Sequence, residues 1–422
     1  MSSPLRFLLL NTFYPPYSFG GDAIYVWRLA NALAADGNLV DVLHCADSYE
    51  LLAGHPSAPP LPSHRNVNVY PLRSYPLALA SVASHQSGFP LGRGKQIADA
   101  MIGKQYDVIH FNNISMFGPG ILRLSSTPRT IRLYSVLEYW LVCAQHTLWK
   151  FDDHKCDWAQ CLQCVIRGHR PLQLWRYTDL LERMASRVDR FLAPSRAVAR
   201  IHLERGFPHP MECLPLFTEV PNGDALGGLA RPIERPYFLF VGRIEAIKGP
   251  QTLLAAWKHL PDADLVIVGD GSLMSHMRDW IGSNPRVHLM GSLAQPEIAR
   301  FYHHAIASVV PSLFEEPFGL TAIEALAHRS PVIAHNVGGL RDIVEESCGG
   351  ILYETSDELT AAMNKLMADP TLRDELGRRG YQACVERWSR QAHLRRYYHI
   401  IEEIASGRGG RSGQDSLDGP LG

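Results

Sequence analysis

Two carboxylates separated by seven residues, Glu316 and Glu324, stand where a loop gives way to a predicted helix. Gly319 punctuates the loop, and the helix should begin near Leu320 or Thr321. The free backbone N–H groups at the start of a helix form a site for an anion. A carboxylate accepts two hydrogen bonds, so Glu324, about one turn into the helix, suits a vicinal diol such as a ribose. Glu316, in the preceding loop, could hold hydroxyls of a second sugar.

Two cations five residues apart, Arg243 and Lys248, follow the apolar run at 237–241. They could neutralise a diphosphate leaving group without a metal ion. Gly242, between the run and the cations, lets backbone approach a ligand closely. Together with the two glutamates, these residues predict a site for a nucleotide diphosphate joined to a sugar.

The first half of the chain offers a second set of polar and glycine residues. Gly20 and Gly21 precede a predicted helix, and such a turn makes a further backbone site for an anion. His110 and Asn112 stand at the end of a predicted strand, where they could contact the acceptor or the donor sugar. The alternatives are a plain turn into a helix for the glycines and a buried core residue for the histidine.

These residues need elements that bring them to one place. Short Val-, Ile- and Leu-rich runs alternate with helical patterns along the whole chain, which is typical of parallel sheets covered on both faces. Ligands of such sheets bind at the carboxyl ends of the strands. The predicted strands are 7–10, 40–44, 106–111, 130–134, 190–193 and 212–214 in the first half, and 237–241, 264–269, 287–291, 307–311, 331–335 and 350–353 in the second.

We therefore expect an α/β protein with two doubly wound Rossmann-like domains that face a cleft. A Pro- and Gly-rich seam between 216 and 236 separates the domains, so the acceptor-side domain should span 1–220 and the nucleotide-sugar domain 221–385. A C-terminal helix at 386–405 should follow. The remainder, 406–422, is rich in Gly, Ser and Arg, and we expect it to be disordered.

Several of these segments resemble one family. The spacing of Glu316 and Glu324 resembles the E-x7-E element of the retaining glycosyltransferase family 4 type (glycosyltransferase group 1), which includes sucrose synthases, glycogen synthases and many bacterial mannosyl- and glucosyltransferases. Gly242-Arg243 with Lys248 is similar to the diphosphate-binding segment of that family. The resemblance is densest over 237–353. It implies a glycosyltransferase B-type fold and transfer from a UDP- or GDP-linked sugar, with retained anomeric configuration, to a saccharide or a lipid-linked acceptor.

The resemblance also implies roles for individual residues. Arg243 and Lys248 would contact the diphosphate, Glu324 the ribose and Glu316 the donor sugar. The phosphates would further be held by backbone groups of Gly20, Gly21, Gly242, Gly319, Leu320 and Thr321.

One position departs from the family pattern. Many relatives carry a His-Asp pair where Leu137 and Glu138 stand here, and that histidine helps to hold the donor sugar. Either Glu138 or His110 takes over this role, or the sugar is oriented differently.

Four cysteines, Cys143, Cys156, Cys161 and Cys164, occur within 22 residues and end in a Cys-x2-Cys spacing. Four thiolates suit a closed tetrahedral zinc site, which would fold an insertion at about 137–170 and play a structural role. Free buried thiols, a disulfide and an iron–sulfur cluster are the alternatives.

The arginines between 166 and 207 raise a further hypothesis. Nine arginines are interleaved there with Leu172, Leu174 and Trp175, and a basic helix of this kind can rest on anionic lipid. That would place the enzyme on the inner face of the membrane, next to a lipid-linked acceptor. The alternative is a solvated, arginine-rich helix face.

Composition and charge limit the classes of function that the chain could have. The net charge of -1 gives no reason to expect nucleic acid as a partner, and no stretch approaches the ~20 apolar residues of a membrane span. We expect a soluble, cytoplasmic protein that needs no catalytic metal. Two rival functions stay open: a nucleotide-sugar epimerase or phosphorylase of the same fold, and a catalytically inactive sugar-binding or scaffold protein.

Overall fold

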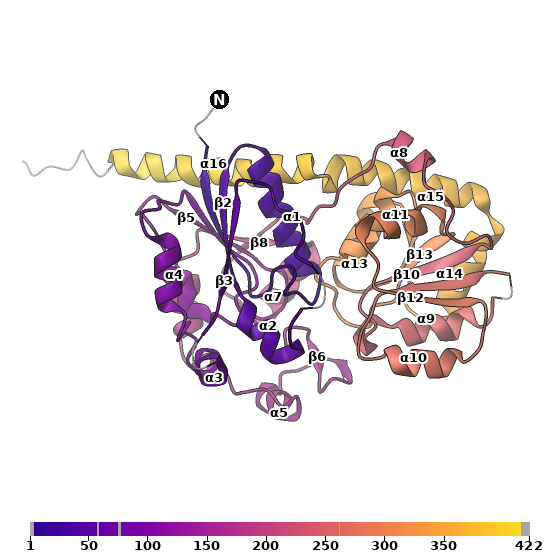
Figure 1. Cartoon of the computed structure of the whole chain (residues 1–422), viewed down its shortest axis with the longest axis horizontal. Coiled ribbons are helices and arrows are strands. Elements are labelled where there is room, and N and C mark those ends of the chain that lie inside the picture. The colour runs from indigo at the N-terminus through magenta and orange to yellow at the C-terminus, as the bar shows by residue number, and fades with distance from the viewer. Residues whose placement is uncertain (1–3, 57–58, 75–76, 261, 415–422) are drawn as a thin grey trace, which may run out of the picture.

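The protein, here as a computed structural model, is described at residues 4–56, 59–74, 77–260 and 262–414. Two parallel sheets form the centres of two domains that lie side by side (Figure 1). The prediction of an α/β fold with two doubly wound Rossmann-like domains is confirmed.

The N-terminal domain has a seven-stranded sheet in the order β3-β2-β1-β4-β5-β8-β9. Its strands are β1 (Arg6–Leu10), β2 (Leu39–Cys45), β3 (Val67–Leu72), β4 (Val108–Phe111), β5 (Ile131–Ser135), β8 (Arg190–Ala193) and β9 (Met211–Cys213). Its helices are α1 (Gly21–Ala35), α2 (Ala46–Ala53), α3 (Leu77–Ser87), α4 (Gly94–Met101), α6 (Leu180–Ala185) and α7 (Arg196–Glu204), with 3-10 turns η1 (Pro119–Arg123) and η2 (Leu174–Tyr177).

The C-terminal domain has a six-stranded sheet in the order β12-β11-β10-β13-β14-β15. Its strands are β10 (Tyr237–Val241), β11 (Asp264–Val268), β12 (Val287–Gly291), β13 (Ala307–Val310), β14 (Val332–His335) and β15 (Gly350–Tyr353). Its helices are α8 (Gly223–Gly227), α9 (Pro250–Trp257), α10 (Met274–Ile281), α11 (Gln295–His304), α12 (Leu320–Ala327), α13 (Gly338–Ser347), α14 (Ser356–Ala368), α15 (Pro370–Ala383) and α16 (Arg390–Gln414), with the 3-10 turn η3 (Ala246–Lys248) and the π-helical η4 (Cys384–Trp388).

The strands form where the sequence has continuous apolar runs, because helices cover both faces of a parallel sheet. In β10, for example, Tyr237, Phe238 and Leu239 are fully buried. The prediction missed β3, an edge strand that pairs only with β2 and leaves Asn68 and Pro71 exposed. A half-exposed edge strand needs no apolar run, so the pattern that revealed the other strands is absent there.

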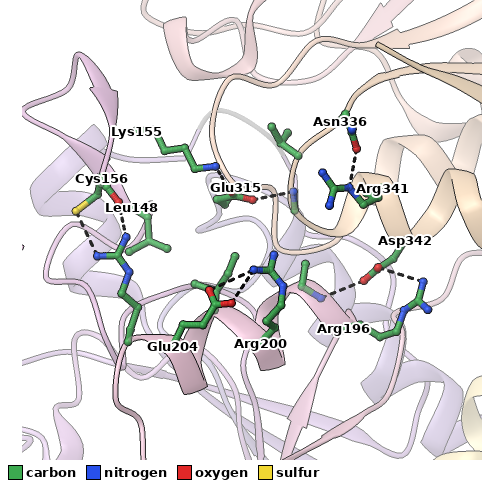
Figure 2. A pocket seen from close by; sticks show the side chains of 15 residues that line it. Leu148, Lys155, Cys156, Arg196, Arg200, Glu204, Glu315, Asn336, Arg341 and Asp342 are labelled. Carbon is green, nitrogen blue, oxygen red and sulfur yellow. Dashed lines mark hydrogen bonds and ion pairs between the residues drawn. The ribbon is translucent and has the colours of Figure 1, made fainter. Parts of the chain in front are cut away.

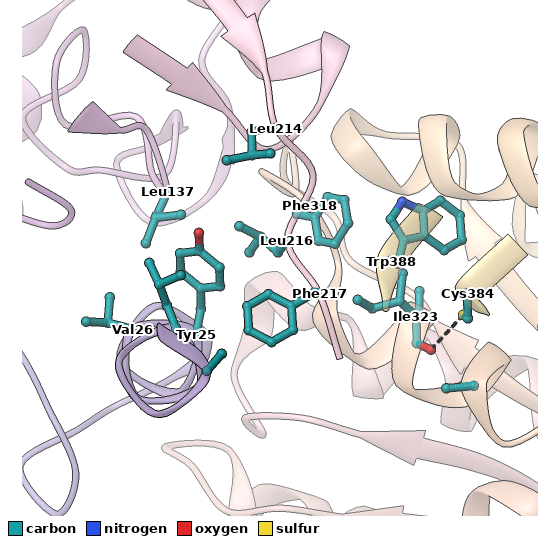
Figure 3. Close-up of a cluster of buried hydrophobic side chains, with 14 of the residues drawn as sticks. Tyr25, Val26, Leu137, Leu214, Leu216, Phe217, Phe318, Ile323, Cys384 and Trp388 are labelled. Atoms are coloured by element: carbon teal, nitrogen blue, oxygen red, sulfur yellow. Dashed lines mark hydrogen bonds between the residues drawn. The ribbon is translucent and has the colours of Figure 1, made fainter. Parts of the chain in front are cut away.

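Side chains from both domains pack into one apolar cluster between the sheets (Figure 3). Tyr25 of α1 lies against Phe217 of the inter-domain linker, with ring centres 6.0 Å apart. Phe318 and Trp388 belong to the same cluster from the C-terminal side, and both are almost fully buried. The domains are therefore joined by a core as well as by the chain.

Helix α16 returns from the second domain across the first, as the yellow ribbon in Figure 1 shows. Its helical residues continue to Gln414, so the expected disorder from 406 is wrong as far as 414. The reason is a tertiary anchor: Arg408 donates to the Asp189 carboxylate at 2.6 Å and to the carbonyl of Arg129 at 2.8 Å. Residues 415–422 of the predicted tail lie outside the described residues.

The cysteine-rich insertion joins β5 to η2. It contains a two-stranded hairpin, β6 (Trp149–Lys150) and β7 (His154–Lys155), followed by α5 (Cys161–Arg167). The arginine-rich segment after it divides into η2, α6, β8 and α7, so its arginines do not lie on one basic helix, and β8 coincides with the strand predicted at 190–193. Trp175 is buried within this segment, and the Arg176 guanidinium stacks on its ring at 4.4 Å.

Candidate active site

The loops that carry the predicted residues leave the centre of each sheet. In both sheets the strand order reverses at the first strand of the domain, between β1 and β4 and between β10 and β13. Open α/β sheets bind ligands at such switch points, beyond the carboxyl ends of the strands. The two glycines follow β1, the two cations follow β10, and the two glutamates follow β13.

The glycine turn of the first domain lies against the anion site predicted in the second. A Cβ atom added to Gly20 would stand 3.9 Å from Nε of Arg243, and one added to Gly21 would stand 3.0 Å from Cδ1 of Leu320. Helix α12 begins at Leu320 after Gly319, whose φ of 118° lies in the left-handed region. The structure thus brings these four predicted residues to one place, with Thr321 in the first turn of the same helix.

Arg243 and Lys248 differ in their surroundings. Arg243 is exposed, and within the described part of the chain its side chain makes no hydrogen bond or ion pair, although its charge opposes the raised pKa of Asp22. Lys248 donates to both oxygens of the Glu316 carboxylate, at 2.9 and 2.8 Å. Ser312 donates to the same carboxylate at 2.8 Å. Glu316 is therefore held rigidly beside a cation, whereas the Arg243 guanidinium is available to an anion.

Glu324 makes a buried contact with the other domain. Its Oε1 accepts a hydrogen bond from the Arg28 guanidinium at 2.6 Å, and its Oε2 lies 3.3 Å from the hydroxyl of Tyr302. Both partners of the ion pair are more than nine-tenths buried. Sequence reasoning gave Arg28 no role. The signal was present, because Arg28 is a charged residue within the otherwise apolar face of α1.

Asp22 and Glu138 place two carboxylates close to the glycine turn. Burial raises the pKa of Asp22, and the neighbouring Glu138 carboxylate raises it further. The amide of Asn113 donates to Asp22 at 3.1 Å and opposes this shift. The second oxygen of Glu138 pairs with Nδ1 of His146, whereas its first oxygen is buried without a hydrogen-bond partner. That first oxygen is a buried acceptor without a partner.

His110 and Asn112 lie inside the first domain. His110 is fully buried, and its ring nitrogens lie 2.9 Å from the hydroxyl of Tyr397 and 2.8 Å from that of Ser135. Burial lowers its pKa to about 3. Asn112 donates to the carbonyl of Leu10 at 3.3 Å. Both ring nitrogens are thus used within the protein, as the core alternative describes, and a contact of His110 with a sugar stays a prediction.

The four cysteines of the insertion line one small cavity of about 20 Å³. None of them is disulfide-bonded, and the Cys164 thiol accepts a hydrogen bond from the backbone N–H of Phe151 at 3.5 Å. Across the described residues, no group of three or more His, Cys, Asp or Glu side chains is arranged so that it could hold a metal ion. Among those same residues, no helix is long and apolar enough to cross a membrane.

Two Rossmann-like domains with the ligand loops turned toward each other define the glycosyltransferase B-type architecture. Residues 19–220 match the family Glycosyltransferase Family 4, and residues 228–383 match the family Glycosyl transferases group 1. The chain therefore carries a domain of each of these two glycosyltransferase families.

Individual relatives agree with this assignment. A D-inositol 3-phosphate glycosyltransferase of Arthrobacter sp. (strain FB24) is 29% identical over 387 residues, which cover 85% of this chain and 84% of that protein. The relative from Xylanimonas cellulosilytica is 35% identical over 158 residues, but the chain matches only 38% of its length. The corresponding share for the relative from Thermobifida fusca is 42%.

Solved structures share the fold across both domains. Sucrose-phosphate synthase from Thermosynechococcus elongatus superposes with a TM-score of 0.73 at 22% identity, covering 96% of this chain and all of that chain. HepE from Anabaena in complex with UDP superposes with a TM-score of 0.65 at 16% identity, covering 94% of this chain and all of that one.

Proposed function

We propose that this protein transfers a sugar from a UDP- or GDP-linked donor to a hydroxyl group of an acceptor, with retention of anomeric configuration. The observation that carries the proposal is the approach of the Gly20-Gly21 turn to Arg243 and to the start of α12. Backbone N–H groups and an unpaired guanidinium then surround one position from two domains. That arrangement suits a diphosphate, whose charge must be stabilised as it leaves.

The residues divide the reaction between them. The bond from the anomeric carbon to the diphosphate oxygen breaks, and a bond to the acceptor oxygen forms. The hydroxyl proton passes to the departing diphosphate. Arg243 and the N–H groups of α12 stabilise that leaving group, while Lys248 holds Glu316 toward the sugar hydroxyls.

The unpaired oxygen of Glu138 supports a role in holding the donor sugar, in place of the histidine found in many relatives. Retention is supported by the state of the nearby carboxylates. Glu316 is engaged by Lys248 and Ser312, and Asp22 is bonded to Asn113 with a raised pKa. Neither is free to attack the anomeric carbon, so we infer substitution on one face without a covalent intermediate.

The acceptor is a saccharide or a lipid-linked saccharide. The names of the relatives support a small polyol or sugar acceptor, and the HepE complex supports a uridine nucleotide in this fold.

A thermal-shift screen against UDP, GDP, ADP and their common sugar conjugates tests the donor site. We expect one nucleotide to raise the Tm of the wild type and to have a much smaller effect on Glu324→Gln. This variant keeps an acceptor for Arg28 while removing the charge that would bind two ribose hydroxyls. A folded wild type that responds to no nucleotide would favour the scaffold alternative. Product analysis with and without acceptor separates transfer from epimerase or phosphorylase chemistry, which would yield isomers or free sugar products.

We propose in addition that the cysteine cluster binds structural zinc. The support is chemical: four thiols line one cavity, and the insertion has little core of its own. The four thiols would have to move closer together than they stand here. Elemental analysis should find about one zinc per wild-type chain and less in Cys164→Ser; metal-free, folded wild type would contradict the proposal.

We also propose peripheral contact with the inner face of an anionic membrane through the insertion and η2. Large apolar side chains are exposed there beside arginines, including Leu162, Ile166, Leu174 and Tyr177. Vesicles containing phosphatidylglycerol should retain the wild type better than Ile166→Glu. Equal retention of the two proteins, or equal binding to phosphatidylcholine vesicles, would contradict it.

A further inference from the structure

A cavity of about 440 Å³ lies between the domains, on the side of Glu315 that faces the cysteine-rich insertion. Three elements enclose it: α7, the start of α13, and the hairpin β6–β7 (Figure 2). This volume is within the range of small-molecule sites in proteins. The cavity is therefore large enough for a ligand of the size of a sugar phosphate.

The walls of the cavity carry an excess of positive charge. Five cationic side chains line it against three carboxylates; the cations are Lys155, Arg196, Arg200, Arg205 and Arg341. Three of them are paired: Lys155 with Glu315, Arg200 with Glu204, and Arg196 with Asp342 at 3.3 Å.

The other two arginines have only neutral partners. Arg341 is exposed and donates from Nε to the side-chain oxygen of Asn336 at 2.6 Å. Arg205 donates to the backbone carbonyl of Cys156. Neither makes an ion pair with a carboxylate among the residues that the structure describes. Arg205 directly follows α7 of the first domain and Arg341 lies on α13 of the second, and both line the cavity. An anion that enters therefore meets guanidinium groups that no carboxylate compensates.

The cavity adjoins the proposed site of the donor sugar. Glu315 lines the cavity, and Glu316 is the next residue. Both carboxylates act on the buried phenol of Tyr139. Burial raises the pKa of Tyr139, and the charges of Glu315 and Glu316 raise it further. A ligand in the cavity would therefore lie next to the residue that we assign to the donor sugar.

We propose that this cavity is the acceptor site and that the acceptor carries a phosphate ester, bound chiefly by Arg341 of the second domain and Arg205 of the first. The inference rests on the proposed function, and it adds the chemical class of the acceptor. The phosphate is either that of a free sugar or polyol phosphate or that of a lipid headgroup.

The insertion is one wall of this site. Lys155 on β7 pairs with Glu315, whose other oxygen accepts from the backbone N–H of Gly338 at 2.8 Å. The hairpin is thereby attached to the second domain directly beside the cavity. The segment that bears the cysteines thus forms part of the proposed acceptor site.

The test uses the full-length protein, saturated with the nucleotide identified in the donor screen. Titration calorimetry measures the affinity of the protein for glucose 6-phosphate and for inorganic phosphate, and compares each with its affinity for neutral glucose. Vesicles of phosphatidylinositol, compared with phosphatidylcholine, probe the lipid source. The variants are Arg341→Ala and Arg205→Ala, and Arg379→Ala is the matched control. Arg379 is also exposed on a helix of the second domain, but it pairs with Glu375 away from the cavity.

We expect the wild type and Arg379→Ala to bind a phosphate ester and to bind glucose far more weakly. Arg341→Ala should bind the ester at least tenfold more weakly, as expected for loss of one hydrogen bond to a charged group. If the wild type binds glucose 6-phosphate but not phosphatidylinositol vesicles, the acceptor is soluble. If the wild type binds the vesicles but not glucose 6-phosphate, and Arg341→Ala loses that binding, the acceptor phosphate is that of a lipid headgroup.

Two results would overturn the inference while leaving the proposed function intact. One is a wild type that binds nucleotide but binds phosphorylated and neutral ligands equally. The other is equal phosphate affinity in Arg341→Ala, Arg205→Ala and Arg379→Ala. A wild type that binds no nucleotide at all would instead overturn the proposed function.

Discussion

The ion pair between Arg28 and Glu324 offers the sharpest test of how the domains are held together. The guanidinium and carboxylate are 2.6 Å apart, and their side chains are only 7% and 8% exposed. Replacing Arg28 by Met would leave the Glu324 carboxylate buried with the Tyr302 hydroxyl as its remaining partner. Removing one partner of a buried ion pair costs about 3–5 kcal/mol, because the other charge is left uncompensated.

The corresponding fall in Tm is about 6–20 °C for a domain of this size. Differential scanning calorimetry of Arg28→Met measures it. Arg183→Met is the control, because Arg183 and Asp179 form an exposed pair with 62% and 66% exposure. Such a pair contributes less than about 1 kcal/mol.

The double variant Arg28→Met/Glu324→Leu completes the experiment. With both charges gone, much of the lost stability should return, since two apolar side chains can fill the same space. The reasoning is refuted if Arg28→Met lowers the Tm no more than Arg183→Met does. It is also refuted if the double variant loses more stability than Arg28→Met and Glu324→Leu lose in total when measured singly.

Three further predictions concern Lys248, His110 and Ser195. Lys248→Met should lower kcat by about 10²–10³. It should cost less stability than Arg28→Met, because Glu316 is more exposed than Glu324 and keeps its hydrogen bond from Ser312. Kinetics and calorimetry of the same variant measure both effects, and a loss of stability as large as that in Arg28→Met with little change in kcat would count against a catalytic role. Burial lowers the pKa of His110 to about 3 and that of His393 to about 4, so at mildly acidic pH the unfolded chain binds protons that the folded chain does not. The free energy of unfolding should therefore fall as the pH falls from about 6.5 toward those values, by about 1.4 kcal/mol per pH unit for each group. His110→Gln should reduce this slope in denaturant titrations between pH 4.5 and 6.5, and an unchanged slope would contradict the assignment. Ser195→Ala should cost about 1–2 kcal/mol in chemical unfolding, because Ser195 caps α7 and also donates to the carbonyl of Pro317 at 2.7 Å; no change would mean that water replaces both bonds.

The sequence predicted the sheets and the loops of the site because both depend on local chemistry. Continuous apolar runs specify buried parallel strands whatever their partners are, and the predicted run at 237–241 coincides with β10. Glycines before a helix and a cation after a strand keep their properties in any fold that places them at a strand end. The approach of Gly20 to Arg243 and of Gly21 to Leu320 agrees with that rule.

The tertiary structure decided what depends on contacts between distant residues. His110 has the residue type and position of a sugar ligand, yet Tyr397, 287 residues later, takes one of its ring nitrogens. Arg408 keeps a glycine-rich segment helical by reaching Asp189. The partner of Glu324, the placement of the insertion against Glu315 and the basic cavity beside it all arise between elements far apart along the chain. Local sequence determines which groups are present and which can end a strand or begin a helix. Only the packing of the two domains determines which of those groups are already satisfied and which remain open to a ligand.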